Sequence, residues 1–69
     1  MRIINQRGNM SLNFESIIIM IDEENICTTL DGKVHVLGKY ASEKRAKEVF
    51  EDIHYSSYGL ENVYCMPEE

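Results

Sequence analysis

Apolar residues in the first part of the chain recur at the spacing of β-strands. Residues 1–6 have the character of a strand, and residues 7–9 (Arg-Gly-Asn) supply a turn in which a positive φ costs little. Residues 10–14 then alternate, with apolar side chains at every second position. We therefore expect these two segments to pair as a hairpin.

The middle of the chain predicts three further strands. Residues 17–21 (Ile-Ile-Ile-Met-Ile) are apolar at every position, which is typical of a central strand covered on both faces. A polar turn follows, and residues 26–30 form the next strand. The pair Asp31-Gly32, between that strand and residues 33–37, is a strong signal for a two-residue hairpin turn.

An amphipathic helix is predicted over residues 42–57. Ser42 is a natural N-cap and Glu43 lies favourably in the first turn. Four apolar side chains follow at helical spacing and are expected to face the sheet: Ala46, Val49, Phe50 and Ile53. Gly59 ends the helix or the turn after it. The tail, residues 60–69, fits either a short last strand or a helical turn.

These elements predict an α+β fold in a single domain over residues 1–69. Residues 1–38 are expected to form a small antiparallel β-meander of about five strands. One helix packs against this sheet, and the tail adds a short C-terminal element. A core of this size rarely supplies more than about 3–5 kcal/mol, so we expect support from a disulfide, a metal or self-association. Cys27 and Cys65 show no metal-ligand spacing and are expected to be unrelated thiols, with a disulfide between them as the alternative. No metal or cofactor is predicted, which leaves a homo-oligomer.

One helix covers only one face of such a sheet, so the other face needs a partner. Ile18, Met20 and Leu37 are expected to lie on this second face and are the candidate oligomer interface. The strand positions expected on the opposite side are Ile17, Ile19, Ile21, Val34 and Val36. The alternative is that the tail folds back and covers the second face with Leu60, Val63 and Tyr64.

Two segments of the sequence resemble a known group of proteins. The opening Met-Arg-Ile-Ile-x-Gln-x-Gly (residues 1–8) and the segment LGKYASEKRAKEVF (residues 37–50) are similar to a loose group of short, mostly uncharacterised proteins of low-GC Gram-positive bacteria and their phages. The resemblance spans residues 1–55, and its motifs are a turn and a capped helix, so it implies a fold and carries over no catalytic residue. Some phage proteins of similar layout inhibit bacterial defence, including by sequestering signalling nucleotides.

No residue pattern indicates catalysis, so the chain is not expected to be an enzyme. His35 lies in the middle of a predicted strand, and His54 lies late in the helix, where the helix C-terminus explains it. Asp22, Glu23 and Glu24 lack the ligand alternation and the glycine of a calcium loop, and a solvated turn explains them.

Charge is unevenly distributed along the chain, whose net charge is −5. Residues 33–47 hold five of the seven basic residues, whereas residues 48–69 hold six acids and no base. The helix therefore begins basic and ends acidic, the reverse of what its dipole favours. The group at the helix start is a candidate anion site: Lys39, Tyr40, Lys44, Arg45 and Lys47. The alternative, which needs no ligand, is that its basic residues only pair with acids one helical turn away.

Two classes of function, with a purely structural domain as a third, follow from this distribution. In the first, the chain is a protein-binding inhibitor or adaptor of a host defence factor, whose acids meet a basic partner: Asp22, Glu23, Glu24, Glu48, Glu51 and Asp52. In the second, it is an oligomeric sponge in which the basic group and an aromatic such as Tyr40 or Tyr55 hold a phosphorylated small molecule. The net charge disfavours direct nucleic-acid binding, and no run of residues predicts a membrane span or leader, so we expect a cytoplasmic protein.

Overall fold

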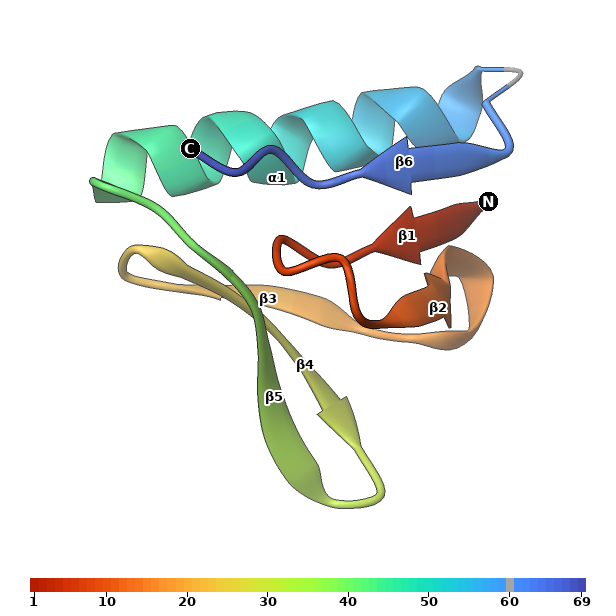
Figure 1. Ribbon diagram of the computed structural model, residues 1–69, viewed down its shortest axis with the longest axis horizontal. Helices are drawn as coiled ribbons and strands as arrows, with labels where there is room; N and C mark the ends of the chain where they lie inside the picture. Colours follow the sequence, from red (N-terminus) through yellow and green to blue (C-terminus); the bar gives the residue numbers. More distant parts are fainter. Residues whose placement is uncertain (60) are drawn as a thin grey trace.

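The computed structural model describes residues 1–59 and 61–69, which form an α+β fold (Figure 1). Within these residues, six strands lie in two small sheets and one α-helix packs against them. The first sheet is mixed and has the order β2-β1-β6, with β1 (Arg2–Ile4), β2 (Ser11–Asn13) and β6 (Val63–Cys65). The second is an antiparallel meander in the order β3-β4-β5, with β3 (Ile19–Asp22), β4 (Asn25–Leu30) and β5 (Lys33–Lys39). The helix α1 runs over Glu43–Tyr58.

The N-terminal hairpin is confirmed, and a buried asparagine orders its turn. In the β1–β2 register, Ile3 lies opposite Leu12. The Asn5 Oδ1 accepts hydrogen bonds from the backbone N–H groups of Asn9 at 3.0 Å and Met10 at 2.9 Å. Gly8 takes the positive φ of 76° that the turn requires. The polar side chain of Asn5 can be buried because the turn backbone satisfies it.

The prediction of one five-strand meander is wrong. After β2 the chain enters the 3₁₀ turn η1 (Phe14–Ser16), where the Asn13 side chain accepts a hydrogen bond from the Glu15 N–H at 3.2 Å. This turn redirects the chain, so β2 pairs with β1 alone and β3 joins the other sheet. The prediction of a central strand over residues 17–21 is also wrong, because β3 begins at Ile19 and is an edge strand.

The predicted hairpin between β4 and β5 is confirmed, with Leu30 opposite Lys33. Asp31 and Gly32 both have positive φ, 52° and 79°, as a type I′ turn requires. Farther along, Cys27 pairs with Val36 but Ile26 pairs with Gly38, so β5 carries one extra residue, a β-bulge at Leu37.

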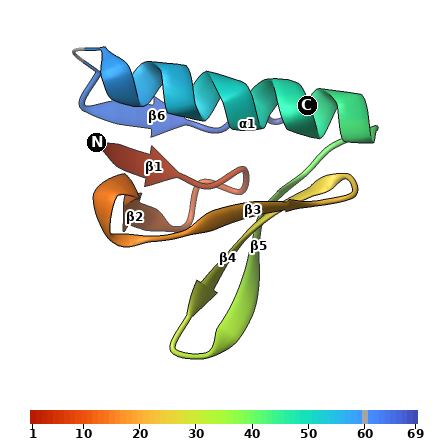
Figure 2. The same cartoon turned by 180° about the vertical axis from the view of Figure 1, so that it is seen from behind.

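The C-terminal segment forms a strand, β6, parallel to β1 with Ile3 opposite Tyr64. It lies beside α1 and β1, on the far side of the first sheet from the β4–β5 hairpin (Figures 1 and 2). After β6, the Met66 N–H donates to the Ile4 carbonyl at 3.0 Å, and the Tyr40 hydroxyl donates to the Pro67 carbonyl at 2.9 Å. The alternative in which the tail covers the second face is therefore wrong for its described residues, and Leu60 lies outside them.

The core lies between α1 and the two sheets. Ser42 caps the helix by accepting a hydrogen bond from the Arg45 N–H at 3.1 Å, and Gly59 is the C-cap, both as predicted. Helix residues and residues of both sheets build the buried cluster: Ile3, Ile26, Leu37, Tyr40, Ala46, Val49, Ile53 and Met66. Phe50 is only half-buried at its margin. Cys27 and Cys65 are free thiols, as expected.

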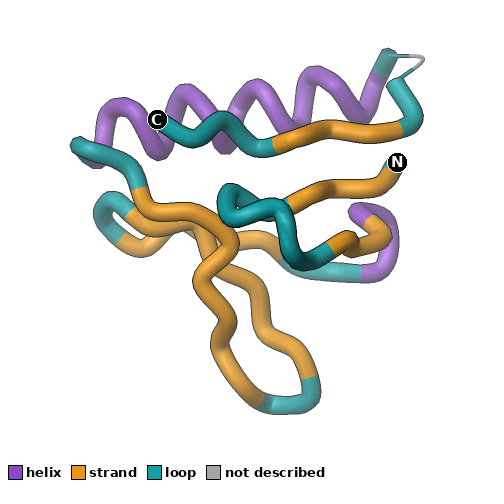
Figure 3. Tube along the Cα trace, in the orientation of Figure 1, coloured by secondary structure: helices purple, strands orange, loops and turns teal. Residues whose placement is uncertain are grey.

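The β4–β5 hairpin extends away from the rest of the fold (Figure 3). Pairing between β3 and β4 stops at Ile19 opposite Thr28. Residues 29–34 are therefore a two-stranded ribbon with no third strand beside them among the described residues.

Candidate functional site

One face of the β3-β4-β5 sheet is apolar and uncovered. Paired residues of an antiparallel sheet project to the same side, and so do residues two apart along a strand. Met20 pairs with Cys27 and Cys27 with Val36, so these three residues share a face with Val34. Ile18 directly precedes β3, two residues before Met20, and Cys27 in the central strand is only 5% exposed. Exposure is 73% for Ile18, 39% for Met20, 66% for Val34 and 55% for Val36. We call these four side chains the open face.

The opposite face of the same sheet packs into the protein, and we call it the covered face. Its apolar residues include Ile19, Ile21 and Ile26, of which Ile26 is fully buried. Thr28 is also fully buried there, and its hydroxyl donates to the Ile18 carbonyl at 2.7 Å. One side of this small sheet is therefore buried in the protein, and the other side is exposed to solvent.

Leu37 is not part of an exposed interface, because it is 1% exposed and belongs to the core. Leu37 directly follows Val36 in β5, so ordinary strand alternation turns its side chain to the covered face, where it packs in the core. The sequence-based placement of Val34 and Val36 opposite Ile18 and Met20 was also wrong, since the register puts all four on one side. Of the predicted interface residues, the structure leaves Ile18 and Met20 exposed.

Acidic residues flank the open face at both ends. Asp22 follows Met20 by two residues and so shares its side of the sheet. Burial raises the pKa of the Cys27 thiol, and the nearby Asp22 carboxylate raises it further. Glu23 lies beside Asp22 in the β3–β4 turn, and Asp31 lies at the hairpin tip. Lys33 lies beside Asp31, so the rim of the open face is net acidic, with most of its negative charge at the β3–β4 turn.

Four of the five candidate anion-binding residues contact groups of the protein itself. The Lys39 ammonium is 3.8 Å from the Glu24 carboxylate, and that of Lys47 is 3.4 Å from Glu43. Tyr40 is in the core. Lys44 is exposed on the outer face of α1.

Arg45 has the largest set of contacts in this group. Its guanidinium donates to the Glu69 backbone oxygen at 3.1 and 2.8 Å and to the Glu48 carboxylate at 3.4 Å. It also lies 6.0 Å from the centre of the Tyr40 ring. At the start of α1, basic Arg45 thus contacts two residues of the acidic C-terminal part of the chain, Glu48 and Glu69.

The candidate acidic residues do not form one surface. Glu24 lies against Lys39 and Glu48 against Arg45. Asp52 accepts a hydrogen bond from the Tyr64 hydroxyl at 2.7 Å; with burial, this raises the pKa of Tyr64 well above its usual range. Glu51 is exposed on α1.

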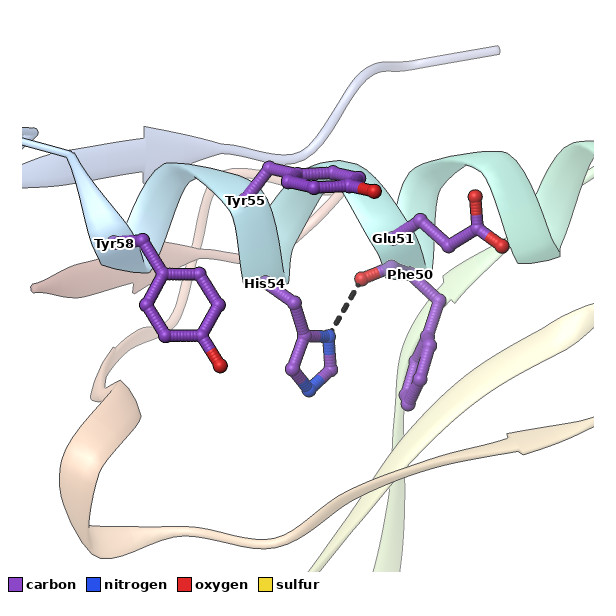
Figure 4. Close-up of a pocket in the computed structure, with 5 residues that line it drawn as sticks. All are labelled: Phe50, Glu51, His54, Tyr55 and Tyr58. Carbon is purple, nitrogen blue, oxygen red and sulfur yellow. Dashed lines mark hydrogen bonds between the residues drawn. The ribbon is translucent and has the colours of Figure 1, made fainter.

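An aromatic hollow on α1 was not found from the sequence. It measures about 370 Å³ and is lined by Phe50, Glu51, His54, Tyr55 and Tyr58 (Figure 4). The His54 Nδ1 lies 2.8 Å from the Phe50 carbonyl oxygen. A carbonyl only accepts, so in this contact Nδ1 carries the hydrogen. Aromatic residues at positions 50, 54 and 58 were the available signal, since this spacing aligns side chains along one helix face.

Two negative findings apply to residues 1–59 and 61–69. No three His, Cys, Asp or Glu side chains are grouped so that they could hold a metal ion. No helix in this part of the chain has the length and apolar character needed to cross a membrane.

The fold and the site define a class of structure: a small α+β domain of two sheets, with one sheet face left uncovered. No protein-family model, curated protein or solved structure is similar enough to this chain to count as a match.

Proposed function

We propose that this chain is a non-enzymatic protein-binding domain that docks onto another protein through its open face. The observation that carries the proposal is the group of four large aliphatic side chains on one side of one sheet, each more than a third exposed. Single exposed apolar residues are ordinary on protein surfaces. A contiguous apolar group with a polar rim is typical of an interaction site.

The hairpin end supports the same function. A two-stranded ribbon is marginally stable in water, and residues 29–34 have only each other as partners. A protein that covers Val34 and Val36 would stabilise this ribbon. An inhibitor or adaptor of a host defence factor, a role known for some phage proteins of similar layout, needs such a surface and no catalytic group.

The proposal is tested with a variant that places charge on the open face. Ile18→Glu combined with Val34→Glu introduces two carboxylates at exposed positions, so folding should be preserved. Val63→Glu is the matched control, because Val63 is 48% exposed but lies on β6 in the other sheet. We expect the double variant to lose the proteins that the wild type retains from a host lysate, measured by quantitative mass spectrometry, and the control to keep them.

Thermal unfolding accompanies this comparison, with both variants expected within about 3 °C of the wild type. A double variant that folds normally and retains the same proteins at wild-type levels would show that the open face is not the contact surface.

A further inference from the structure

We infer that the partner on the open face is a short, basic, amphipathic segment of another protein, and not a second copy of this chain. The inference rests on the proposed function and adds the chemistry of the partner. Two properties of the open face carry it: its size and the charge of its rim.

The open face is too small for a stable contact between two globular domains. Neighbouring strands lie about 4.8 Å apart, so the three strands span roughly 10 Å between the axes of β3 and β5. Its four side chains expose apolar surface on the order of 300–400 Å². A stable protein interface buries about 800 Å² on each partner, so two copies stacked face to face would reach only the size of a lattice contact.

The same dimensions suit one helix or strand. A helix with its side chains is about 10–12 Å across, close to the width of the open face. Anchors at positions i, i+4 and i+7 of such a helix would contact Ile18, Met20 and Val36 together. A single segment therefore covers this surface without needing a larger contact area.

The rim decides the charge of the partner. Asp22 and Glu23 lie at one end of the open face and Asp31 at the other, and Lys33 beside Asp31 offsets part of this charge. Near the β3–β4 turn, the positive charge of Lys39 is paired with the Glu24 carboxylate. A second copy would bring the same acids, and a net charge of −5, against this rim. A basic segment places opposite charges there.

The test uses three synthetic peptides of about 14 residues, roughly four helical turns. The first has leucines along one helix face and lysines elsewhere. The second replaces each lysine with glutamate. The third keeps the leucines and lysines of the first in an order with no apolar face. Binding is followed by backbone amide shifts of the isotope-labelled protein, which report both affinity and location.

We expect the amphipathic lysine peptide to bind with a Kd of about 100 μM and to shift residues of the open face. The glutamate and the scrambled peptide should bind at least about tenfold more weakly. Raising NaCl from about 50 to 500 mM should weaken binding of the lysine peptide at least about threefold. Asp22→Lys with Glu23→Lys should reduce the preference for lysine over glutamate by about tenfold, and Ile18→Glu with Val34→Glu should abolish binding at the open face.

Three results would overturn the inference. Equal affinities of the lysine and glutamate peptides would show that charge does not determine binding. An equal affinity of the scrambled peptide and the amphipathic lysine peptide would show that an apolar helix face is not required. A dimer in sedimentation that salt strengthens and Ile18→Glu dissociates would identify a second copy as the occupant. That last result would still leave the open face as a contact surface, whereas retention of lysate partners by the double variant would reject the proposed function itself.

Discussion

The two sides of the β3-β4-β5 sheet use similar residues and meet different environments. On the covered face Ile26 is fully buried, while on the open face Ile18 is 73% exposed. Both are isoleucines, Ile26 within β4 and Ile18 directly before β3, with the same intrinsic preference for extended backbone. Their difference lies in what packs against them: Ile26 belongs to the core cluster with residues of α1 and the first sheet, whereas Ile18 stays largely exposed.

This comparison separates residues that stabilise the fold from residues that are available for binding. Burying an aliphatic side chain contributes about 1.5–3 kcal/mol, and only the covered face receives it within the monomer. The apolar side chains of the open face stay in water and gain no such stabilisation in the monomer. Substitutions on the two sides should therefore affect different measurements.

The largest expected effect comes from Ile26 on the covered face. Ile26→Ala should cost about 3–4 kcal/mol, because it removes a fully buried side chain and leaves a cavity. Since a core of this size supplies only about 3–5 kcal/mol, the variant should be largely unfolded in urea titrations. Ile26→Val should remain folded and lose about 1 kcal/mol. Ile18→Ala is the matched control and should change stability by less than about 0.5 kcal/mol; an equal loss would mean that the open face is covered in the monomer.

Two neighbouring threonines give the second contrast. Thr28→Val should cost about 1–2 kcal/mol, because the Ile18 carbonyl loses the hydroxyl that donates to it at 2.7 Å in a buried site. Thr29→Val, at an exposed position on the other side of β4, should change stability by less than about 0.5 kcal/mol. Urea unfolding of both variants checks this, and equal effects would contradict the assignment of faces.

The two cysteines give a contrast in reactivity and pH dependence. Cys27 is buried and its thiol pKa is raised, so at about pH 8 iodoacetamide should label the exposed Cys65 at least about tenfold faster. Asp22→Asn should speed labelling of Cys27, because it removes the carboxylate that raises the pKa. Mass spectrometry of timed samples measures both rates.

The same raised pKa has a consequence for stability. The folded protein holds the Cys27 proton to higher pH than the unfolded chain does. The protonated Cys27 thiol therefore makes its full contribution to the free energy of unfolding below the ordinary thiol pKa of about 8.5. That contribution decreases as the pH rises through the pKa of the thiol in the folded protein. Cys27→Ala should flatten the alkaline decrease of the unfolding free energy, and an unchanged pH profile would contradict the assignment.

The smallest effect is expected at Val36, on the open face beside the bulge. Val36→Thr keeps the β-branched shape and should change the free energy of unfolding by less than about 0.5 kcal/mol. Its effect should appear instead as weaker retention on a hydrophobic-interaction resin than that of the wild type. A loss above about 1 kcal/mol would mean that Val36 packs within the monomer.

Local sequence signals predicted the local elements well. The Asp31-Gly32 turn, the N-terminal hairpin and the helix from Ser42 to Gly59 follow from turn chemistry, alternation and capping, which depend on neighbouring residues. The candidate sites were less predictable. Ile18 and Met20 were identified as exposed apolar residues, but Val34 and Val36 were placed on the wrong side and the aromatic hollow was not found.

The sequence by itself determined the α+β class, because alternation and helical spacing are properties of consecutive residues. Only the tertiary structure decided how the strands divide into two sheets, since the pairing of β6 with β1 joins residues about sixty positions apart. It also decided which side chains stay exposed. Alternation places Val36 and Leu37 on opposite faces of β5, but only the packing of the core decides that Leu37 is buried and Val36 is exposed.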